Sequence, residues 1–268
     1  MAAPDDELAV AVALHQAGRV AEAAQAYDRL LAHDPRNADA LHLAGVAACQ
    51  MGDGATGIER MQRAIALRPA VPDYHFNLGN ALKDLGRFED AAAAYRRAVQ
   101  LRPLYVEALS NLGAALKQLG RSAEAGECFR QAIRLRPTHA DAQLGIGAVE
   151  LEQGHLVEAA AAFQKAIALR PRDAEAQYGL AAAYCGQDRL AEAADALGKA
   201  LALSPGHVEA LNLLGVVRTR QRRIPEAIAP CARPCGGIPG TAWRSTTSPR
   251  CSRSAARSRR RSGSPRPA

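Results

Sequence analysis

Residues 72–105 read PDYHFNLGNALKDLGRFEDAAAAYRRAVQLRPLY, and the same pattern returns at a fixed interval through most of the chain. Prolines mark the interval, since they stand 34 residues apart, at Pro35, Pro69, Pro103, Pro137, Pro171 and Pro205. A spacing this regular indicates that the chain repeats one supersecondary unit. Such units stack on their neighbours and build extended surfaces, so the repeat predicts a binding protein rather than a catalytic pocket.

Aligned on these prolines, the chain divides into six full units and part of a seventh. The units span 4–37, 38–71, 72–105, 106–139, 140–173 and 174–207, with a partial unit over 208–228. Positions 8, 20 and 27 of the unit are nearly always glycine or alanine, as at Gly79, Ala91 and Ala98. Small side chains at fixed points of an apolar pattern predict close helix contacts, because a larger side chain would overpack them.

Each unit is predicted to hold two helices joined by a tight turn. Leu78, Leu82 and Leu85 recur at spacings of four and three, which marks one face of a helix. Gly86 predicts the end of that helix, because glycine readily adopts the left-handed C-cap conformation. The second helix carries a large apolar residue at position 24, here Tyr95, and closes on Leu-Arg-Pro. Proline cannot continue a helix, and we expect the arginine to lie in the last turn and complement the helix dipole.

The length of the unit, its small residues at positions 8, 20 and 27, its large residue at position 24 and its proline at position 32 together resemble the tetratricopeptide repeat family. The resemblance covers residues 4–228, although the usual aromatic residue at position 4 is missing. It implies an all-α fold, a right-handed superhelix (α-solenoid) of six full repeats and a partial seventh. It also implies a protein–protein interaction scaffold whose first helices line a concave surface.

The positive charge of the chain is concentrated at its end. From Arg218 onward there are thirteen arginines, no lysine and a single acid, Glu226, which gives +12. Because the whole chain carries +7, residues 1–217 carry −5. The repeats are therefore mildly acidic.

The first residues and the hydropathy of the chain predict its compartment. Residues 1–7 are acidic and lack the positive region and apolar run of a signal peptide. No stretch approaches the ~20 apolar residues that span a bilayer. We therefore expect a cytoplasmic protein without a membrane partner.

The repeat pattern fails in the seventh unit. Pro230 and Pro234 fall inside its second helix, each at a cost of ~3 kcal/mol, and residues 229–268 are rich in Arg, Ser and Pro without any period. One interpretation is a disordered basic arm that binds nucleic acid through Arg257–Arg261. The other, which we favour, is a shifted reading frame or a truncation, because the break falls within a helix. A missing polar cap would leave the last repeat able to self-associate.

The sequence contains no motif of catalysis. Phosphate-binding loops, nucleophile elbows and zinc-protease helices are absent, and the seven histidines are scattered. Cys231 and Cys235 are four residues apart, but no histidine or second cysteine pair follows in range. We therefore predict a non-enzymatic protein without a cofactor or a metal site.

Asparagines and lysines in the third and fourth repeats are the candidate binding residues. In the family, positions 2, 5, 6, 9, 12 and 13 face the concave surface, and Asn77 and Asn111 share position 6 while Asn80 holds position 9. Asparagine offers a donor and an acceptor to a peptide backbone, and this stretch resembles the asparagine ladder of O-linked N-acetylglucosamine transferases. Lys83 and Lys117 share position 12 and add two cations. The predicted peptide-binding set is these five residues, against the alternative of solvated surface side chains.

The same resemblance argues against a receptor for chaperone C-termini. Asn80 and Asn111 match the asparagines of the two-carboxylate clamp in that class. The positions of its cations hold Phe76, Asp141 and Gly145 instead, so the charge is absent or reversed.

Acidic residues occupy position 2 in six consecutive repeats. These are Asp39, Asp73, Glu107, Asp141, Glu175 and Glu209. They attract basic peptides in one interpretation. In the other, which we favour, they compensate helix dipoles at ~0.3–1 kcal/mol each.

Three functions follow from these patterns. The first is a non-enzymatic adaptor that holds an extended peptide or a partner helix in its groove. The second is the recognition array of a glycosyl- or sulfotransferase whose catalytic domain would lie beyond residue 228. The third is nucleic-acid binding through the arginine-rich tail.

Overall fold

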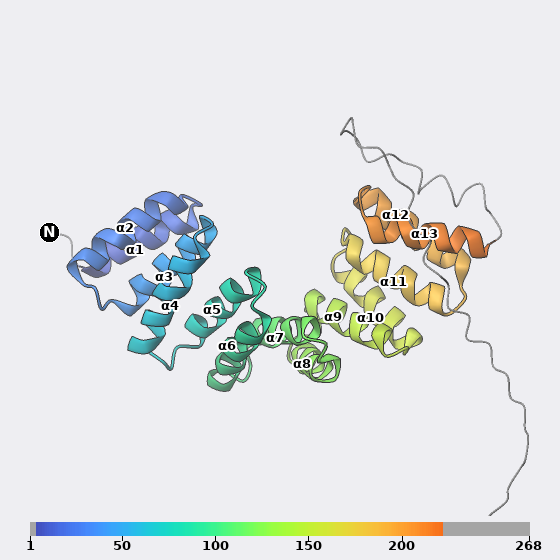
Figure 1. Ribbon diagram of the computed structural model, residues 1–268, viewed down its shortest axis with the longest axis horizontal. Coiled ribbons are helices and arrows are strands. Elements are labelled where there is room, and N and C mark those ends of the chain that lie inside the picture. Colours follow the sequence, from blue (N-terminus) through green and yellow to red (C-terminus); the bar gives the residue numbers. More distant parts are fainter. Residues whose placement is uncertain (1–3, 222–268) are drawn as a thin grey trace, which may run out of the picture. The chain divides into compact units, whose positions relative to one another are not determined.

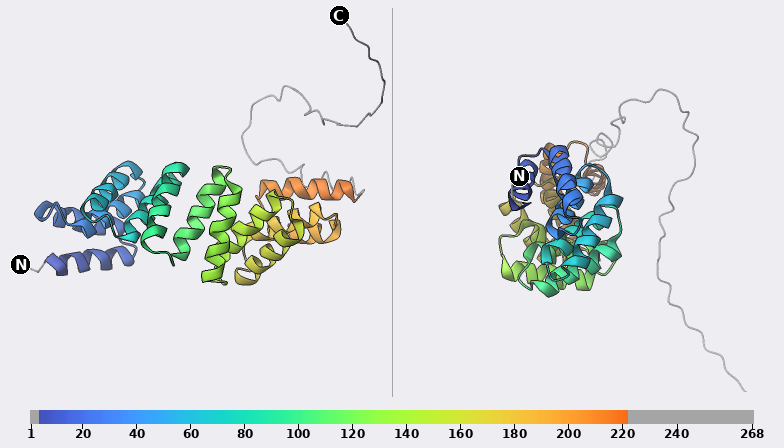
Figure 2. Two further views of the ribbon diagram at one scale, coloured as in Figure 1. Left: turned by 90° about the horizontal axis from the view of Figure 1, so that it is seen from below. Right: turned by 90° about the vertical axis from the view of Figure 1, so that its left-hand side faces the viewer.

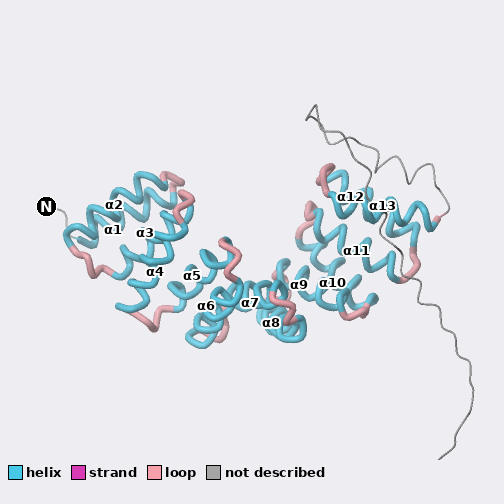
Figure 3. The backbone as a smooth tube through the Cα atoms, viewed as in Figure 1, coloured by secondary structure: helices cyan, strands magenta, loops and turns pink. Residues whose placement is uncertain are grey.

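The computed structural model describes residues 4–221, and residues 1–3 and 222–268 lie outside the described part. The described residues form thirteen α-helices without any strand (Figures 1 and 3). The first helices of the repeats are α1 (Pro4–Gln16), α3 (Ala38–Gln50), α5 (Pro72–Asp84), α7 (Val106–Gln118), α9 (Ala140–Glu152), α11 (Ala174–Gly186) and α13 (Val208–Arg220). The second helices are α2 (Val20–His33), α4 (Gly54–Leu67), α6 (Phe88–Leu101), α8 (Ser122–Leu135), α10 (Leu156–Leu169) and α12 (Leu190–Leu203).

The helices stack in sequence order, which confirms the predicted all-α solenoid. Every helix packs against the next, and each odd-numbered helix also touches the following odd-numbered one (Figure 2). Within residues 4–221 the even-numbered helices make no such contact with one another. The odd-numbered helices are therefore crowded together, and the face that they form is the concave one.

The small residues at position 8 allow the two helices of a repeat to touch, as predicted. A Cβ atom on Gly79 would lie 2.6 Å from the ring of Tyr95, and one on Gly113 would lie 2.8 Å from the ring of Phe129. The large residues at position 24 are all buried: Tyr27, Met61, Tyr95, Phe129, Phe163 and Leu197. Each buried side chain of this size contributes ~1.5–3 kcal/mol.

The turn inside each repeat uses a left-handed residue at position 15. Gly86 has a φ of 73°, and the amide of Arg87 donates to the carbonyl of Leu82 to close the end of α5. In the sixth repeat Asp188 takes this place with a φ of 62°. Leu85, which the spacing placed on one helix face with Leu78 and Leu82, is the C-cap residue of α5 and is exposed, whereas the other two are buried.

The Leu-Arg-Pro arginines have a role that the sequence interpretation missed. They are C-cap residues, and each reaches the acid at position 2 of its own repeat. The pairs are Arg68–Asp39 at 2.6 Å, Arg102–Asp73 at 2.8 Å, Arg136–Glu107 at 2.6 Å and Arg170–Asp141 at 2.6 Å. We call this series the arginine–acid ladder. The arginines thus lie at the C-caps rather than in the last turn, and four acids of the row have a specific partner.

The predictions about the seventh repeat and the tail fall on residues outside the described part. These are the break at 229, the basic arm 229–268, and Cys231 and Cys235. Among residues 4–221, none of the helices combines the length and the hydropathy that crossing a bilayer requires.

Candidate functional site

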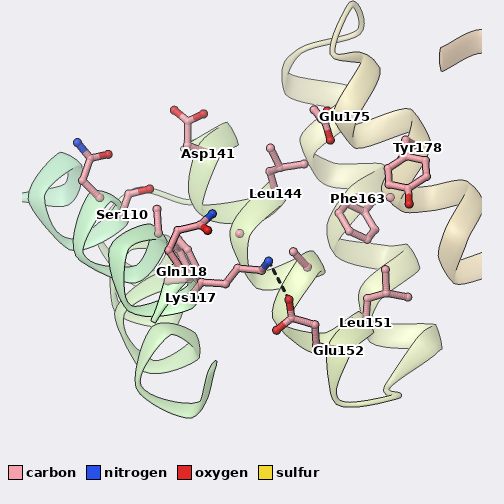
Figure 4. Close-up of a pocket in the computed structure, with 16 residues that line it drawn as sticks. Ser110, Lys117, Gln118, Asp141, Leu144, Leu151, Glu152, Phe163, Glu175 and Tyr178 are labelled. Atoms are coloured by element: carbon pink, nitrogen blue, oxygen red, sulfur yellow. Dashed lines mark ion pairs between the residues drawn. The ribbon is translucent and has the colours of Figure 1, made fainter. Parts of the chain in front are cut away.

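The concave face contains two separate hollows. The larger has a volume of about 680 Å³, and α7, α9 and α11 supply most of its lining (Figure 4). The smaller, of about 290 Å³, lies mainly between α3 and α5. We call them the C-terminal hollow and the N-terminal hollow.

The structure divides the five predicted binding residues between the two hollows. Asn77 and Asn80 line the N-terminal hollow, and Asn111 and Lys117 line the C-terminal hollow. Lys83 lines neither of them. All five side chains are half-buried. Four of them line hollows along the first helices of the repeats, but the five do not converge on one site, and their role in binding stays a prediction.

The three asparagines are held by contacts between neighbouring repeats. Asn77 Nδ2 donates to His42 Nε2 at 2.9 Å, while Asn80 Oδ1 accepts from the Tyr95 hydroxyl at 2.7 Å and from Asn111 Nδ2 at 2.9 Å. Within residues 4–221 the other half of each amide has no hydrogen-bond partner. The asparagines are therefore fixed in orientation and keep one polar group each for a ligand.

His42 is a neutral acceptor in this arrangement. Burial lowers the pKa of His42 to about 4, although the charges of Asp39 and Asp73 oppose the shift. An uncharged imidazole can leave Nε2 unprotonated, and an amide nitrogen such as Asn77 Nδ2 can only donate. The low pKa and the hydrogen bond are therefore consistent.

The two lysines differ in their pairing. Lys117 Nζ lies 2.8 Å from Glu152 Oε1 (Figure 4). Ser122 donates a second hydrogen bond to that carboxylate. Burial raises the pKa of Glu152, but the bonds from Lys117 and Ser122 outweigh it and leave the pKa below its usual value. Lys83 forms a longer ion pair, with 3.7 Å between its Nζ and Asp84 Oδ1. The cation of Lys117 is thus already neutralised across the groove.

The floor of the C-terminal hollow is apolar, which the sequence interpretation did not anticipate. Glycines hold position 6 in the fifth and sixth repeats, and a Cβ atom on Gly145 would lie 2.4 Å from the ring of Phe129. The same distance separates a Cβ atom on Gly179 from the ring of Phe163. Both rings therefore reach the groove, where Leu144, Ala148, Leu151 and Tyr178 extend the apolar lining. The sequence signal that could have revealed this apolar floor is a phenylalanine at position 24 followed by a glycine at position 6 of the next repeat.

The described residues hold no cluster of metal-binding side chains. None of their His, Cys, Asp and Glu side chains gather in threes that could hold a metal ion. Cys49, Cys128 and Cys185 are free thiols, and burial raises the pKa of Cys49 and of Cys128. Protonated thiols are poor nucleophiles.

Comparison with protein families matches most of the chain to two repeat models. The model described as "Tetratricopeptide repeat" matches residues 8–72, 110–174, 144–207 and 178–237. The model described as "TPR repeat" matches residues 79–120. The match over residues 178–237 extends beyond residue 228, the predicted end of the repeat array. Comparison with curated proteins gives no match.

Several solved structures have a similar fold. PilF of Pseudomonas aeruginosa is 21% identical with a TM-score of 0.69, over 77% of this chain and 94% of that one. MamA of Desulfovibrio magneticus RS-1 is 27% identical with a TM-score of 0.55, over 60% and 90%. YrrB, described as a TPR protein with an unusual peptide-binding site, is 19% identical with a TM-score of 0.59, over 70% and 97%. These likenesses support the fold.

Proposed function

Because the chain belongs to the tetratricopeptide repeat family, we propose that it is a non-catalytic scaffold that binds an extended peptide or a partner helix along its concave face. Repeats 3 to 6 supply the contacts in this proposal. YrrB, a protein of similar fold, is described as having a peptide-binding site, which supports the general function but not the choice of residues.

The C-terminal hollow is the observation that carries the proposal. It combines an apolar floor with polar groups at its edge, including Asn111 and Lys117. Ligand sites in proteins have this composition, since apolar contact supplies affinity and a few polar groups fix orientation. An apolar side chain of a bound segment would cover Leu144 and Leu151, which are only half-buried in the free protein.

The asparagines of repeats 3 and 4 complement this floor. Asn77 and Asn111 each keep a carbonyl oxygen, and Asn80 keeps an amide nitrogen, without a partner in residues 4–221. These groups match the N–H and C=O groups of an extended backbone. The proposed ligand therefore runs from the asparagines of repeats 3 and 4 to the apolar floor of repeats 5 and 6.

A displayed library of random twelve-residue peptides, panned against the full chain, tests this proposal. The selected peptides should shift the amide NMR signals of α5, α7, α9 and α11. Leu144→Glu should weaken them at least tenfold, because it places a charge on the apolar floor. Val157→Glu is the matched control, since Val157 is 69% exposed on α10. Binding that survives Leu144→Glu, or shifts confined to the even-numbered helices, would refute the groove.

The asparagine contribution has its own test. Asn77→Ala and Asn111→Ala should each weaken the selected peptides about fivefold, which corresponds to one hydrogen bond of ~1 kcal/mol. Unchanged affinity in both variants would limit the site to the apolar floor.

The other two functions concern residues outside the described part. A transferase domain would lie beyond residue 228, and the arginine-rich tail begins after it. Nothing in residues 4–221 favours either function over peptide binding, so neither is proposed.

A further inference from the structure

The arginine–acid ladder has a gap in the sixth repeat, beside the C-terminal hollow. Repeats 2 to 5 end on Leu-Arg-Pro, but the sixth ends on Leu203-Ser204-Pro205. Its position-2 acid, Glu175, therefore lacks the arginine that every described pair of the ladder contains. Glu175 and Ser204 border an open hollow of about 750 Å³, which Arg170 and Arg172 also line without forming an ion pair with Glu175.

The surroundings of Glu175 leave its carboxylate available. Its side chain is 68% exposed, whereas the four paired acids are 42–59% exposed. The nearest basic group in residues 4–221 is the buried His207, whose Nε2 lies 3.3 Å from Glu175 Oε1 without hydrogen-bond geometry. His207 also lies against Glu209 and packs on the ring of Tyr178.

Glu175 stands out among the charged residues that line the C-terminal hollow. Lys117 and Glu152 neutralise each other, and Asp141 is paired with Arg170. Glu175 has no Lys or Arg partner within the described residues. It lies three and four residues before Tyr178 and Gly179 on α11, so all three share one face of that helix. Of the carboxylates that border the apolar floor, Glu175 is therefore the one without a Lys or Arg partner in residues 4–221.

We propose that the C-terminal hollow selects a segment in which a large apolar residue is followed or preceded closely by lysine or arginine. The apolar side chain covers the floor at Gly145 and Gly179, and the cation takes the place beside Glu175 that the ladder arginine fills in other repeats. Glu175 and Gly179 are four residues apart on α11, or about 6 Å along the helix. Because an extended chain advances about 3.3 Å per residue, the cation stands one or two residues from the apolar anchor. This inference rests on the proposed groove function and adds the chemistry of its ligand.

The ladder gap allows a test that leaves the hollow itself intact. Ser204→Arg restores the missing arginine and should neutralise Glu175, while Glu175→Gln removes the charge directly. Ala202→Arg is the matched control, because Ala202 is exposed on α12 and the change adds the same charge without facing Glu175. The probes are synthetic nonapeptides of Gly and Ser with Phe at the centre and Lys, Ser or Glu two residues away.

The unaltered chain should bind the Lys peptide at least tenfold more tightly than the Glu peptide. Ser204→Arg and Glu175→Gln should reduce this ratio to about two or less, while the preference for Phe over Ser at the centre remains. Ala202→Arg should keep most of the ratio. A Lys-to-Glu affinity ratio that persists in both Ser204→Arg and Glu175→Gln would overturn the inference. A ratio that falls equally in Ala202→Arg would overturn it as well.

The same experiment distinguishes a failure of this inference from a failure of the proposed peptide-binding function. If Phe peptides bind without any preference for Lys, the hollow is a peptide site and only the role of Glu175 is refuted. If no nonapeptide binds and the twelve-residue library also yields none, the proposed function fails with it.

Discussion

The hydroxyl of Tyr95 donates to Asn80 Oδ1 at 2.7 Å, and so joins the buried core of the third repeat to the polar part of its groove. Tyr95 is fully buried between its two helices, whereas Asn80 lines the N-terminal hollow. One side chain therefore serves both packing and the orientation of a candidate binding residue.

Tyr95→Phe should lower the free energy of unfolding by about 1 kcal/mol, because Asn80 Oδ1 loses one of its two donors but keeps Asn111. Urea denaturation followed by circular dichroism measures this change. Tyr178→Phe is the control, since the Tyr178 hydroxyl has no hydrogen-bond partner within residues 4–221, and its stability should be unaltered. A loss of similar size in both variants would contradict the role of the Tyr95 bond.

Gly145→Ala should destabilise the array by about 1–3 kcal/mol, because its Cβ atom would lie 2.4 Å from the ring of Phe129. Gly198→Ala is the matched control within a helix of the same array. Nothing lies within 4 Å of a Cβ atom there, so the better helix propensity of alanine should stabilise α12 by about 0.5–1 kcal/mol. Melting temperatures that move in the same direction for both variants would refute the close packing.

The left-handed turn residue predicts opposite effects in two neighbouring repeats. Gly154→Ala should destabilise by about 1 kcal/mol, because Gly154 has a φ of 81° that alanine adopts at a cost. Asp188→Gly should not destabilise, since it relieves a φ of 62° and loses only an exposed pair with Arg220. Chemical denaturation of both variants checks this. A marked loss in Asp188→Gly would show that the Arg220 pair dominates.

Mild acid should weaken the contact between the second and third repeats through His42. Its pKa is about 4 in the folded chain and near 6.5 when exposed, so the unfolded state binds a proton first as the pH falls. The contribution of His42 to the free energy of unfolding is fully present above pH 6.5 and decreases toward pH 4, with a loss of roughly 2 kcal/mol by pH 5.

His42→Gln isolates that effect, because glutamine does not titrate and offers an oxygen to Asn77. The unfolding free energy of this variant should fall less between pH 8 and pH 5 than that of the unaltered chain. Equal decreases in the two proteins would assign the acid sensitivity to other groups.

The sequence predicted the fold because the period fixes several positions at once. The glycine at 79, the aromatic residue at 95 and the proline at 103 each specify a local structure, and all three agree on the same helix pair. Repetition then multiplies the signal. The period also brought Asn77, Asn80, Asn111 and Lys117 to hollows along the first helices, but their role in binding stays a prediction.

The hydrogen-bond partners of those residues could not be predicted, because they depend on which side chains meet between repeats. Asn111 meets Asn80, but Gly145 at the same position meets Phe129. The ladder arginines were missed for another reason. Position 31 and position 2 are 29 residues apart, and only the stacked fold shows that they are neighbours.

The arginine–acid ladder has a consequence for how such an array can change in length. Each pair joins two residues of one repeat, as Arg102 joins Asp73, so duplicating or deleting a whole unit leaves the pairs of the other ladder repeats intact. The groove contacts behave differently, because Lys117–Glu152 and Asn111–Asn80 each cross a boundary between units. A gain or loss of one repeat therefore preserves the charge pairs within the remaining repeats. The groove contacts between repeats change at the new boundary, and with them the surface that would bind a ligand.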